Sequence, residues 1–550
     1  MTLSDDTLLQ VAILGPAVSG VVWLMLLRWP RLRRAAAGMV WLAGHAAAWA
    51  LFWRLYEGDT VVWRGFEPDL LRASVFAIAE IGVLFALIRG DALGRRAAVG
   101  AVVALTVSMS AVAFGAYSTS LVAQAVFLPV PTLAAMAASL AGSERPRLAA
   151  FGGLAAADLI GVLGLAVLFD RSGSSIVSSA GAMGLGSGLL LASAAAKAGA
   201  VPGIATWTLT AAPGPDALVT AAVRAQGVAL SALAGPIVAG VNGSVPLAIA
   251  SVVAAVLAGA AGLLAARANG SLAAAIGASA AMPFLALGLG GSVGLRAYLL
   301  LVPAFLLASG LLLLVGWHGD DEPVAGRSSR VRRWVGGAAA AVSVASLTGL
   351  PPSGGFPGTW LTFDLATSRG GIEPLYVVVV GAAVLGLVAA AVGAVGLLRV
   401  ANPHWIPASL GAVTAGLLLY VGSLPVRVGG GWWARVEDAL NAPLVLSFAG
   451  ATSLPPVAGE VLLSAFAAAA IPIALVVLLG RGFRDAGGTF AGLTHRANPG
   501  SPEGRTTTGR KLRASGERLY VGMAAAILIE GAAAWSIVLL VVRAGRRGFL

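Results

Sequence analysis

The sequence contains no cysteine and only four histidines. The absence of cysteine excludes disulfide scaffolds, cysteine-ligated zinc, iron–sulfur clusters and thiol nucleophiles. The histidines are too widely separated to form a recognisable metal or haem motif: they are His45, His318, His404 and His495. The sequence therefore indicates no catalytic residue, no metal site and no bound cofactor in this chain.

Charged residues are scarce as well. Only 11% of the 550 residues are charged, whereas 58% are hydrophobic, and the mean hydropathy is +0.90. Soluble domains carry about 25% charged residues, so the composition argues against a water-soluble enzyme. The 36 basic residues outnumber the 24 acidic ones, but most of them lie in the gaps between apolar runs. This distribution is typical of a multi-pass membrane protein and not of one that binds nucleic acid.

Long apolar runs fill most of the chain. A helix needs about 20 apolar residues to cross about 30 Å of hydrocarbon, so the runs predict an all-α, polytopic membrane protein with about sixteen transmembrane helices. They lie near 6–27, 35–54, 70–89, 95–116, 118–140, 147–169, 181–211, 215–240, 244–267, 271–290, 295–316, 333–367, 374–398, 407–424, 457–480 and 519–543.

We divide the chain into three regions: N-terminal helices over 1–116, a core over 117–425, and C-terminal helices over 426–550. The last region contains a linker over 481–518 that is rich in Gly, Thr, Ser and Arg. Arginines concentrate in the odd-numbered connections, which the positive-inside rule places in the cytoplasm, with the N-terminus outside. Arginines also follow the last run, so the charge rule leaves the side of the C-terminus open.

Two runs are too long for a simple crossing and contain helix breakers. The run 181–211 holds Pro202 and Gly203. The run 333–367 holds a longer string of such residues, among them Pro351, Pro352, Gly354 and Gly355. Proline removes a backbone donor and glycine tolerates the resulting geometry, so we expect a broken helix in each run. A simple proline kink is the alternative for the first. Helices broken within the membrane are typical of transporters.

Several ionisable residues fall inside apolar runs, where they are costly and therefore candidates for function. They are His45, Glu80, Asp158, Lys197, Arg224 and Glu530. The alternative is an ion pair or hydrogen-bonded anchor between packed helices, which we favour for His45 and Glu530.

Lys197 stands out because the chain has only two lysines, the other being Lys511, against 34 arginines. Arginine cannot be deprotonated in a protein, whereas a buried lysine can release its proton. A paired charge costs less in the bilayer than an isolated one, so we expect Asp158, on a neighbouring run, to be its partner.

The motifs around these residues resemble the antiporter-like membrane subunits of respiratory complex I. The resemblance is carried by Lys197-Ala-Gly-Ala-Val-Pro202 with Trp207, Pro213-Gly214-Pro215 and Ala217-Leu218, by Gly349 to Phe356, by Ala150-Phe151 with Asp158, and by Gly65-Phe66 with Asp69-Leu70-Leu71. It spans roughly 65–370 and keeps the family's order; sixteen helices with a basic connection before the last are similar to the largest such subunit.

The resemblance implies two inverted repeats of five helices, each with a broken helix, and a mid-membrane proton path. Lys197 and Asp158 match positions of that path, and Arg224, Asp364 and Glu80 are further candidates. The chain departs from the family pattern at positions that are neutral here: Gln124, Thr220, Pro303, Leu307 and Thr359. The first half of the path is thus better preserved than the second, which leaves open whether pumping survives.

The function that the resemblance implies is that of an antiporter-like, proton-translocating membrane subunit of an NADH-quinone oxidoreductase-like or related energy-converting complex. Such a subunit is a multi-pass protein of the inner or plasma membrane, has no redox cofactor, and works with other membrane subunits to move protons or small cations. Two alternatives remain open: a degenerate, non-pumping scaffold subunit, and a membrane component of a cation/proton antiporter or an inorganic-carbon uptake system.

Overall fold

A computed structural model describes residues 4–63, 66–90, 95–142, 148–172, 185–200, 215–240, 244–264, 268–316, 327–350, 352–368 and 405–423. Nearly all of them lie in helices, apart from turns and two isolated bridges that join Phe66 to Trp63 and Ser118. The predicted runs 374–398, 457–480 and 519–543, the linker 481–518 and Glu530 lie outside the described residues.

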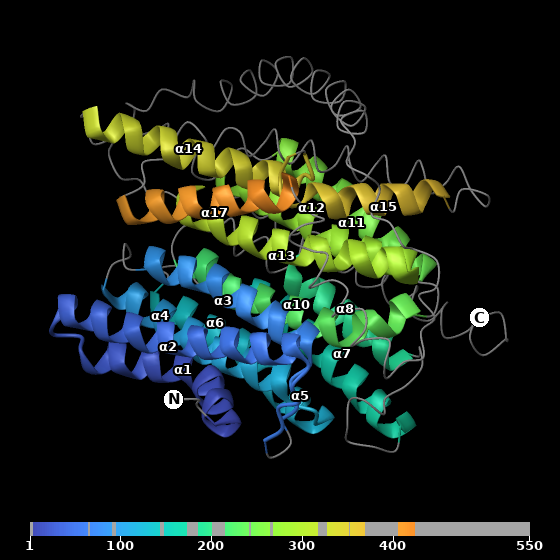
Figure 1. The fold of residues 1–550 in the computed structure, drawn as a ribbon, viewed down its shortest axis with the longest axis horizontal. Helices are drawn as coiled ribbons and strands as arrows, with labels where there is room; N and C mark the ends of the chain where they lie inside the picture. Colours follow the sequence, from blue (N-terminus) through green and yellow to red (C-terminus); the bar gives the residue numbers. More distant parts are fainter. Residues whose placement is uncertain are drawn as a thin grey trace, which may run out of the picture. The chain divides into compact units, whose positions relative to one another are not determined.

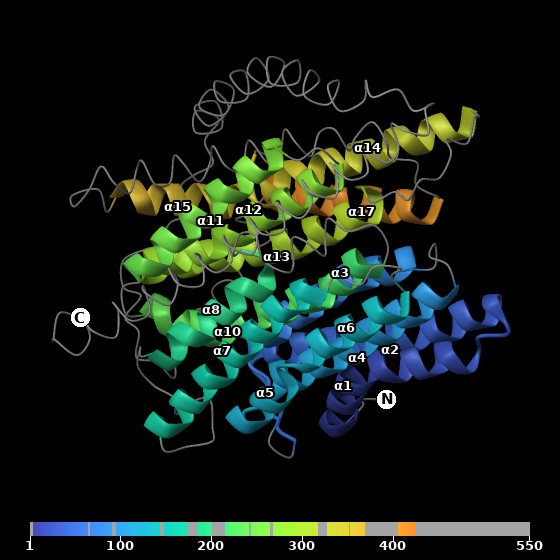
Figure 2. The same ribbon diagram turned by 180° about the vertical axis from the view of Figure 1, so that it is seen from behind.

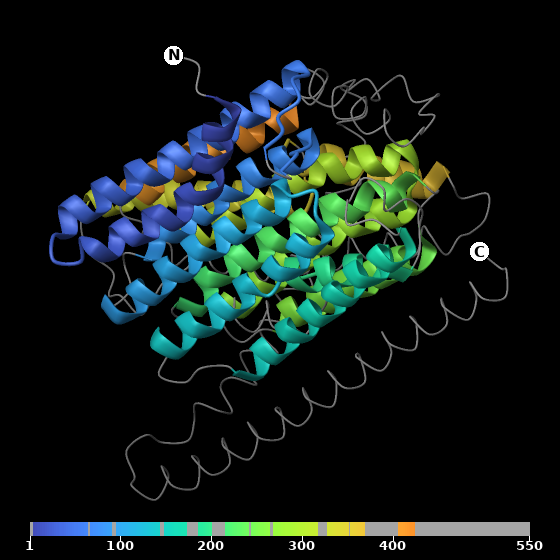
Figure 3. The same cartoon turned by 90° about the horizontal axis from the view of Figure 1, so that it is seen from below.

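The described helices run along a common direction (Figures 1, 2 and 3). Their bounds are α1 Asp5–Met25, α2 Pro30–Glu57, α3 Leu70–Gly90, α4 Arg95–Tyr117, α5 Leu121–Phe127, α6 Val130–Gly142, α7 Leu148–Ser172, α8 Leu185–Ala198, α10 Pro215–Gly240, α11 Val245–Leu264, α12 Ala268–Leu289, α13 Gly291–Gly316, α14 Arg327–Leu347, α15 Phe356–Ser368 and α17 Trp405–Ser423. Contacts of α13 with α3 and α10 join the helices of the N-terminal half to those that follow.

Seven segments within the described helices are long and apolar enough to cross a membrane. They are Asp5–Met25, Ala35–Glu57, Leu70–Ile88, Ala98–Tyr117, Leu121–Leu140, Phe151–Phe169 and Val293–Val315. The expectation of an all-helical, polytopic membrane protein is therefore confirmed. The total of about sixteen crossings and the inverted repeats remain predictions.

Local sequence sets the helix ends near the N-terminus. The Ser4 hydroxyl accepts a hydrogen bond from the Thr7 N–H, which caps α1. Two aspartates in the first turn stabilise the helix further, because their negative charges lie at the positive end of the helix dipole. Helix α2 begins with Pro30 and ends before Gly58, whose φ of 97° places it in the left-handed region.

The helical hydrogen-bond ladder is interrupted between α14 and α15, inside the run 333–367. Gly349 has a φ of 68° and its neighbour Leu350 donates back to the Ala345 carbonyl at 2.8 Å, a left-handed helix end. Gly355 then donates its N–H to Ser346 Oγ at 3.1 Å. A Cβ at Gly355 would lie only 1.9 Å from the Ser346 carbonyl oxygen, so the turn requires glycine there.

Glycines also permit close contact between α7 and α8. A Cβ on Gly164 would lie 2.8 Å from the Gly186 carbonyl oxygen and 2.9 Å from the Leu190 nitrogen. These obstacles are backbone atoms, which cannot move without shifting a helix. Small residues at this crossing bring the two backbones together, as is usual between helices in membranes.

We expect Gly164→Ala to destabilise the folded protein by about 1–3 kcal/mol, because its methyl group overpacks the α7–α8 contact. Gly152→Ala is the matched control on the same helix, since a Cβ there meets nothing within 4 Å. Thermal unfolding of the purified protein in detergent measures both. Equal unfolding midpoints for the two variants would contradict the close approach of α7 and α8.

Candidate functional site

Lys197 lies on the last turn of α8 and forms an ion pair with Asp158 of α7. The two side chains are 0% and 7% exposed, so the pair is enclosed by protein and does not face lipid. The structure thus brings together the two residues that the sequence analysis paired. An opposite charge in contact greatly reduces the cost of burying either ion.

Two further acceptors complete the surroundings of the Lys197 ammonium. It donates to the Leu128 carbonyl at 2.9 Å and to Oε1 of Gln226, which belongs to α10. An ammonium has three N–H donors, and Asp158, Leu128 and Gln226 supply one acceptor each. The site is therefore built to hold the charged form of the lysine with its donors satisfied.

The Leu128 carbonyl lies in the break between α5 and α6. Helix α5 ends at Phe127 and α6 begins at Val130. Pro131 has no N–H to offer the Phe127 carbonyl four residues earlier, which breaks the regular pattern of helical bonds. The Gln226 amide donates to these carbonyls instead, at 2.9 Å to Leu128 and 3.4 Å to Phe127.

Gln226 and the Leu128 carbonyl are functional groups that sequence reasoning missed. The available signals were an amide inside the apolar run 215–240 and the Pro129–Pro131 pair inside the run 118–140. Neither signal says that the two meet at a lysine on a third helix.

The end of α8 also favours a cation. Gly199 has a φ of 92°, and Ala200 donates back to the Ala195 carbonyl at 2.8 Å, so α8 ends just after Lys197. Lys197 therefore belongs to the last turn of α8, where the helix dipole favours a cation. Gly227 lets α10 pack closely against the end of α8, since a Cβ there would lie 2.3 Å from the Ala198 nitrogen. Pro202 and Gly203, the predicted breakers of this run, lie outside the described residues.

Glu80 belongs to a different cluster, between α2 and α3. Its fully buried carboxylate contacts His45 Nδ1 at 3.0 Å, and Trp49 Nε1 donates to His45 Nε2 at 3.0 Å. Because an indole N–H only donates, Nε2 is the acceptor and Nδ1 carries the hydrogen that bonds Glu80. This arrangement fits the anchor between helices that we favoured for His45.

The remaining predicted residues are distributed as follows. Arg224 is 3% exposed on α10, two residues before Gln226 and so on another side of the helix. Asp364 lies on α15. Pro352, Gly354 and Gly355 lie in the turn before α15, whereas Pro351 lies outside the described residues.

Buried charge is unevenly distributed among the side chains that the structure describes. Arg72, Glu80, Asp158, Lys197 and Arg224 are buried, and all five precede residue 240. From 244 to 423, the buried polar side chains with described surroundings are serines, threonines and Tyr298. The neutral positions Gln124, Thr220, Leu307 and Thr359 are all buried too.

No protein-family profile matches this chain, and no curated protein sequence matches it. Solved structures do. A chain of the membrane-bound sulfane sulfur reductase, an archaeal respiratory membrane complex, is 16% identical with a TM-score of 0.61, covering 92% of this chain and 99% of that one. A chain of the Mrp complex from Dietzia sp. is 17% identical with a TM-score of 0.62, covering 81% and 98%.

A chain of respiratory complex I from Thermus thermophilus, with bound aureothin, is 23% identical with a TM-score of 0.59, covering 76% of this chain and 98% of that one. The fold of this protein is therefore that of membrane components found in complex I, Mrp and sulfane sulfur reductase complexes. The resemblance drawn from the motifs is confirmed at the level of the fold.

Breaking the ion pair should be costly and removing it whole should not. We expect Asp158→Leu or Lys197→Met alone to cost about 3–5 kcal/mol, because each leaves one buried charge without its partner. The double variant should regain most of that loss, since no unpaired ion remains. Unfolding midpoints of the four proteins in detergent measure the coupling; additive losses would show that the two side chains do not interact.

Proposed function

We propose that this chain is an antiporter-like, proton-translocating membrane subunit of an NADH-quinone oxidoreductase-like or related energy-converting complex, seated in the cell membrane. The observation that carries the proposal is the buried Asp158–Lys197 pair at the end of α8. An enclosed lysine that can gain and lose a proton next to a carboxylate is suited to hold a proton in transit. The shared fold with components of three multi-part complexes supports a role among partner subunits.

The chain's residues would act by charge exchange. The ammonium of Lys197 holds the proton, Asp158 balances its charge, and Gln226 with the Leu128 carbonyl orients it. Release of the proton removes a positive charge and leaves Asp158 without its counter-ion, so the acid tends to take up a proton itself. A site of this kind passes protons without any bound cofactor, and the driving chemistry belongs to partner subunits.

A second candidate is a scaffold subunit with little transport of its own. The distribution of buried charge favours it, since the described side chains beyond residue 240 include no buried Asp, Glu, Lys or Arg. In a scaffold, the ion pair serves only to hold α7 against α8.

Lys197→Arg separates the two candidates. Arginine keeps the positive charge but cannot release its proton, so it should abolish proton uptake by vesicles carrying the assembled complex while the complex still forms. Lys511→Arg is the matched control at the only other lysine, in the predicted linker, and should leave uptake unchanged. Normal uptake with Lys197→Arg would defeat the transport proposal and favour the scaffold.

The identity of the partners decides between the complexes that use this fold. We expect the chain, purified in mild detergent, to bring down other integral membrane proteins together with a redox module. Co-purification with membrane proteins alone would favour the cation/proton antiporter, and a soluble partner without redox centres would favour the inorganic-carbon uptake system. Mass spectrometry of the purified complex gives the answer.

A further inference from the structure

A small cavity lies beside the Lys197 site and extends toward the start of α3. Its lining combines three polar side chains, Arg72, Gln124 and Gln226, with apolar residues of α4, α5 and α10. It has room for about one or two water molecules. A cavity of that size with several polar groups is the kind that water occupies, whereas purely apolar cavities stay empty.

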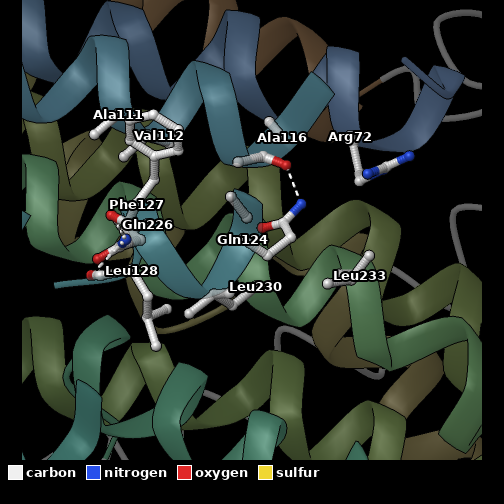
Figure 4. Close-up of a pocket in the computed structure, with 12 residues that line it drawn as sticks. Arg72, Ala111, Val112, Ala116, Gln124, Phe127, Leu128, Gln226, Leu230 and Leu233 are labelled. Atoms are coloured by element: carbon white, nitrogen blue, oxygen red, sulfur yellow. Dashed lines mark hydrogen bonds between the residues drawn. The ribbon is translucent and has the colours of Figure 1, made fainter. Parts of the chain in front are cut away.

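One end of the cavity is in contact with the lysine site. Gln226 lines the cavity, and its Oε1 accepts from the Lys197 ammonium while its Nε2 donates to the Leu128 carbonyl. Figure 4 shows Gln226 beside Phe127 and Leu128, with Arg72 at the opposite side and Gln124 between them. One amide side chain thus separates the ammonium from the space.

The other end is closed by a cation. Arg72 is 6% exposed and bonds the Ser118 carbonyl at 3.0 Å, the same carbonyl that Gln124 reaches at 3.3 Å. Arg72 also forms an ion pair with Asp69, whose side chain is 46% exposed just before α3. The contact between Arg54 and Asp5 shows that α2 ends on the same face as the start of α1. Asp69 lies in the connection from the end of α2 to the start of α3, and therefore on this N-terminal face. The arginine distribution predicts that this face is the outer one.

The Arg72 guanidinium therefore borders a space that fits water, and the Lys197 site lies on its other side, behind Gln226. A guanidinium at a narrow polar passage is an electrostatic barrier to protons, because a hydronium ion there would meet a like charge in a medium of low dielectric constant. The Asp69 carboxylate holds Arg72 in place from the exposed side.

We propose that this cavity is an internal water site between Lys197 and the membrane face that bears Asp69, and that the Arg72 cation keeps protons from leaking along it. The barrier role rests on the proposed function, since a barrier to protons matters only beside a proton-carrying lysine. Gln226 and Arg72 are positioning and barrier residues in this account, and neither takes up the transported proton.

The water site is tested with D₂O as the probe. The chain has no cysteine, so Ala229→Cys places a single thiol of this chain in the cavity wall, and the infrared S–H band is obtained as a difference from the unsubstituted complex. Ala222→Cys, fully buried on the same helix but not in the cavity lining, is the control. We expect the cavity thiol to exchange about tenfold faster, because a wetted group needs no local opening of the fold.

A plug tests where the water comes from. Ala116→Leu fills the cavity between Gln226 and Arg72 and should slow exchange at Ala229→Cys to the rate of the control, whereas Ala155→Leu on the exposed side of α7 should not. Gly115→Ala is a smaller plug, since its methyl group would lie 3.1 Å from Gln124 Oε1. Equal exchange at the two thiols, or exchange that neither plug slows, would overturn the water site whatever the chain transports.

The barrier is tested by passive proton permeability of vesicles under an imposed pH gradient, without turnover. The neutral double variant Arg72→Gln/Asp69→Asn should collapse the gradient severalfold faster than the unsubstituted complex, and Arg72→Lys, which keeps the charge, should not. A tight membrane with the double variant would overturn the barrier. If Lys197→Arg still abolishes uptake in that case, the proposed function stands and only this inference fails.

Discussion

The cost of keeping one ammonium group inside an apolar helix bundle governs the arrangement of the surrounding helices. An unpaired charge at that depth is far too expensive to persist, so every donor of Lys197 must find an acceptor. The carboxylate comes from α7, the amide from α10 and a carbonyl from the kink after α5. Four helices are thereby required to converge on one atom.

Convergence of that kind needs features that weaken ordinary helices. The carbonyl that the lysine uses lies in the proline-containing break between α5 and α6, and the left-handed Gly199 ends α8 just after Lys197. Gly164 and Gly227 remove the side chains that would hold α7 and α10 away from α8. Helix breakers and small residues thus serve the same purpose here, which is to let polar groups hydrogen-bond to one another inside the helix bundle.

The sequence was sufficient to predict helix α10 and the pairing of Lys197 with Asp158, but not the other polar contacts of the buried residues. The run 215–240 coincides with α10, and depth within the apolar runs, together with the rarity of lysine, singled out Lys197 and Asp158. Gln226 was not predicted, because an amide in an apolar run has no partner until the kink at 128–129 is placed in three dimensions. Glu80 was chosen by its depth, but its bond to His45 depends on how α2 rotates against α3, which the apolar pattern does not specify.

The central claim is that Lys197 exchanges its proton during turnover, and nitrogen NMR of lysine side chains tests it most directly. The chain carries two lysines, so the spectrum of a Lys197→Arg complex identifies the Lys197 signal by difference and Lys511 provides an internal reference. We expect the Lys197 signal to alternate between ammonium and amine when the complex is driven, while the Lys511 signal does not change. A Lys197 signal that stays ammonium throughout turnover would contradict it.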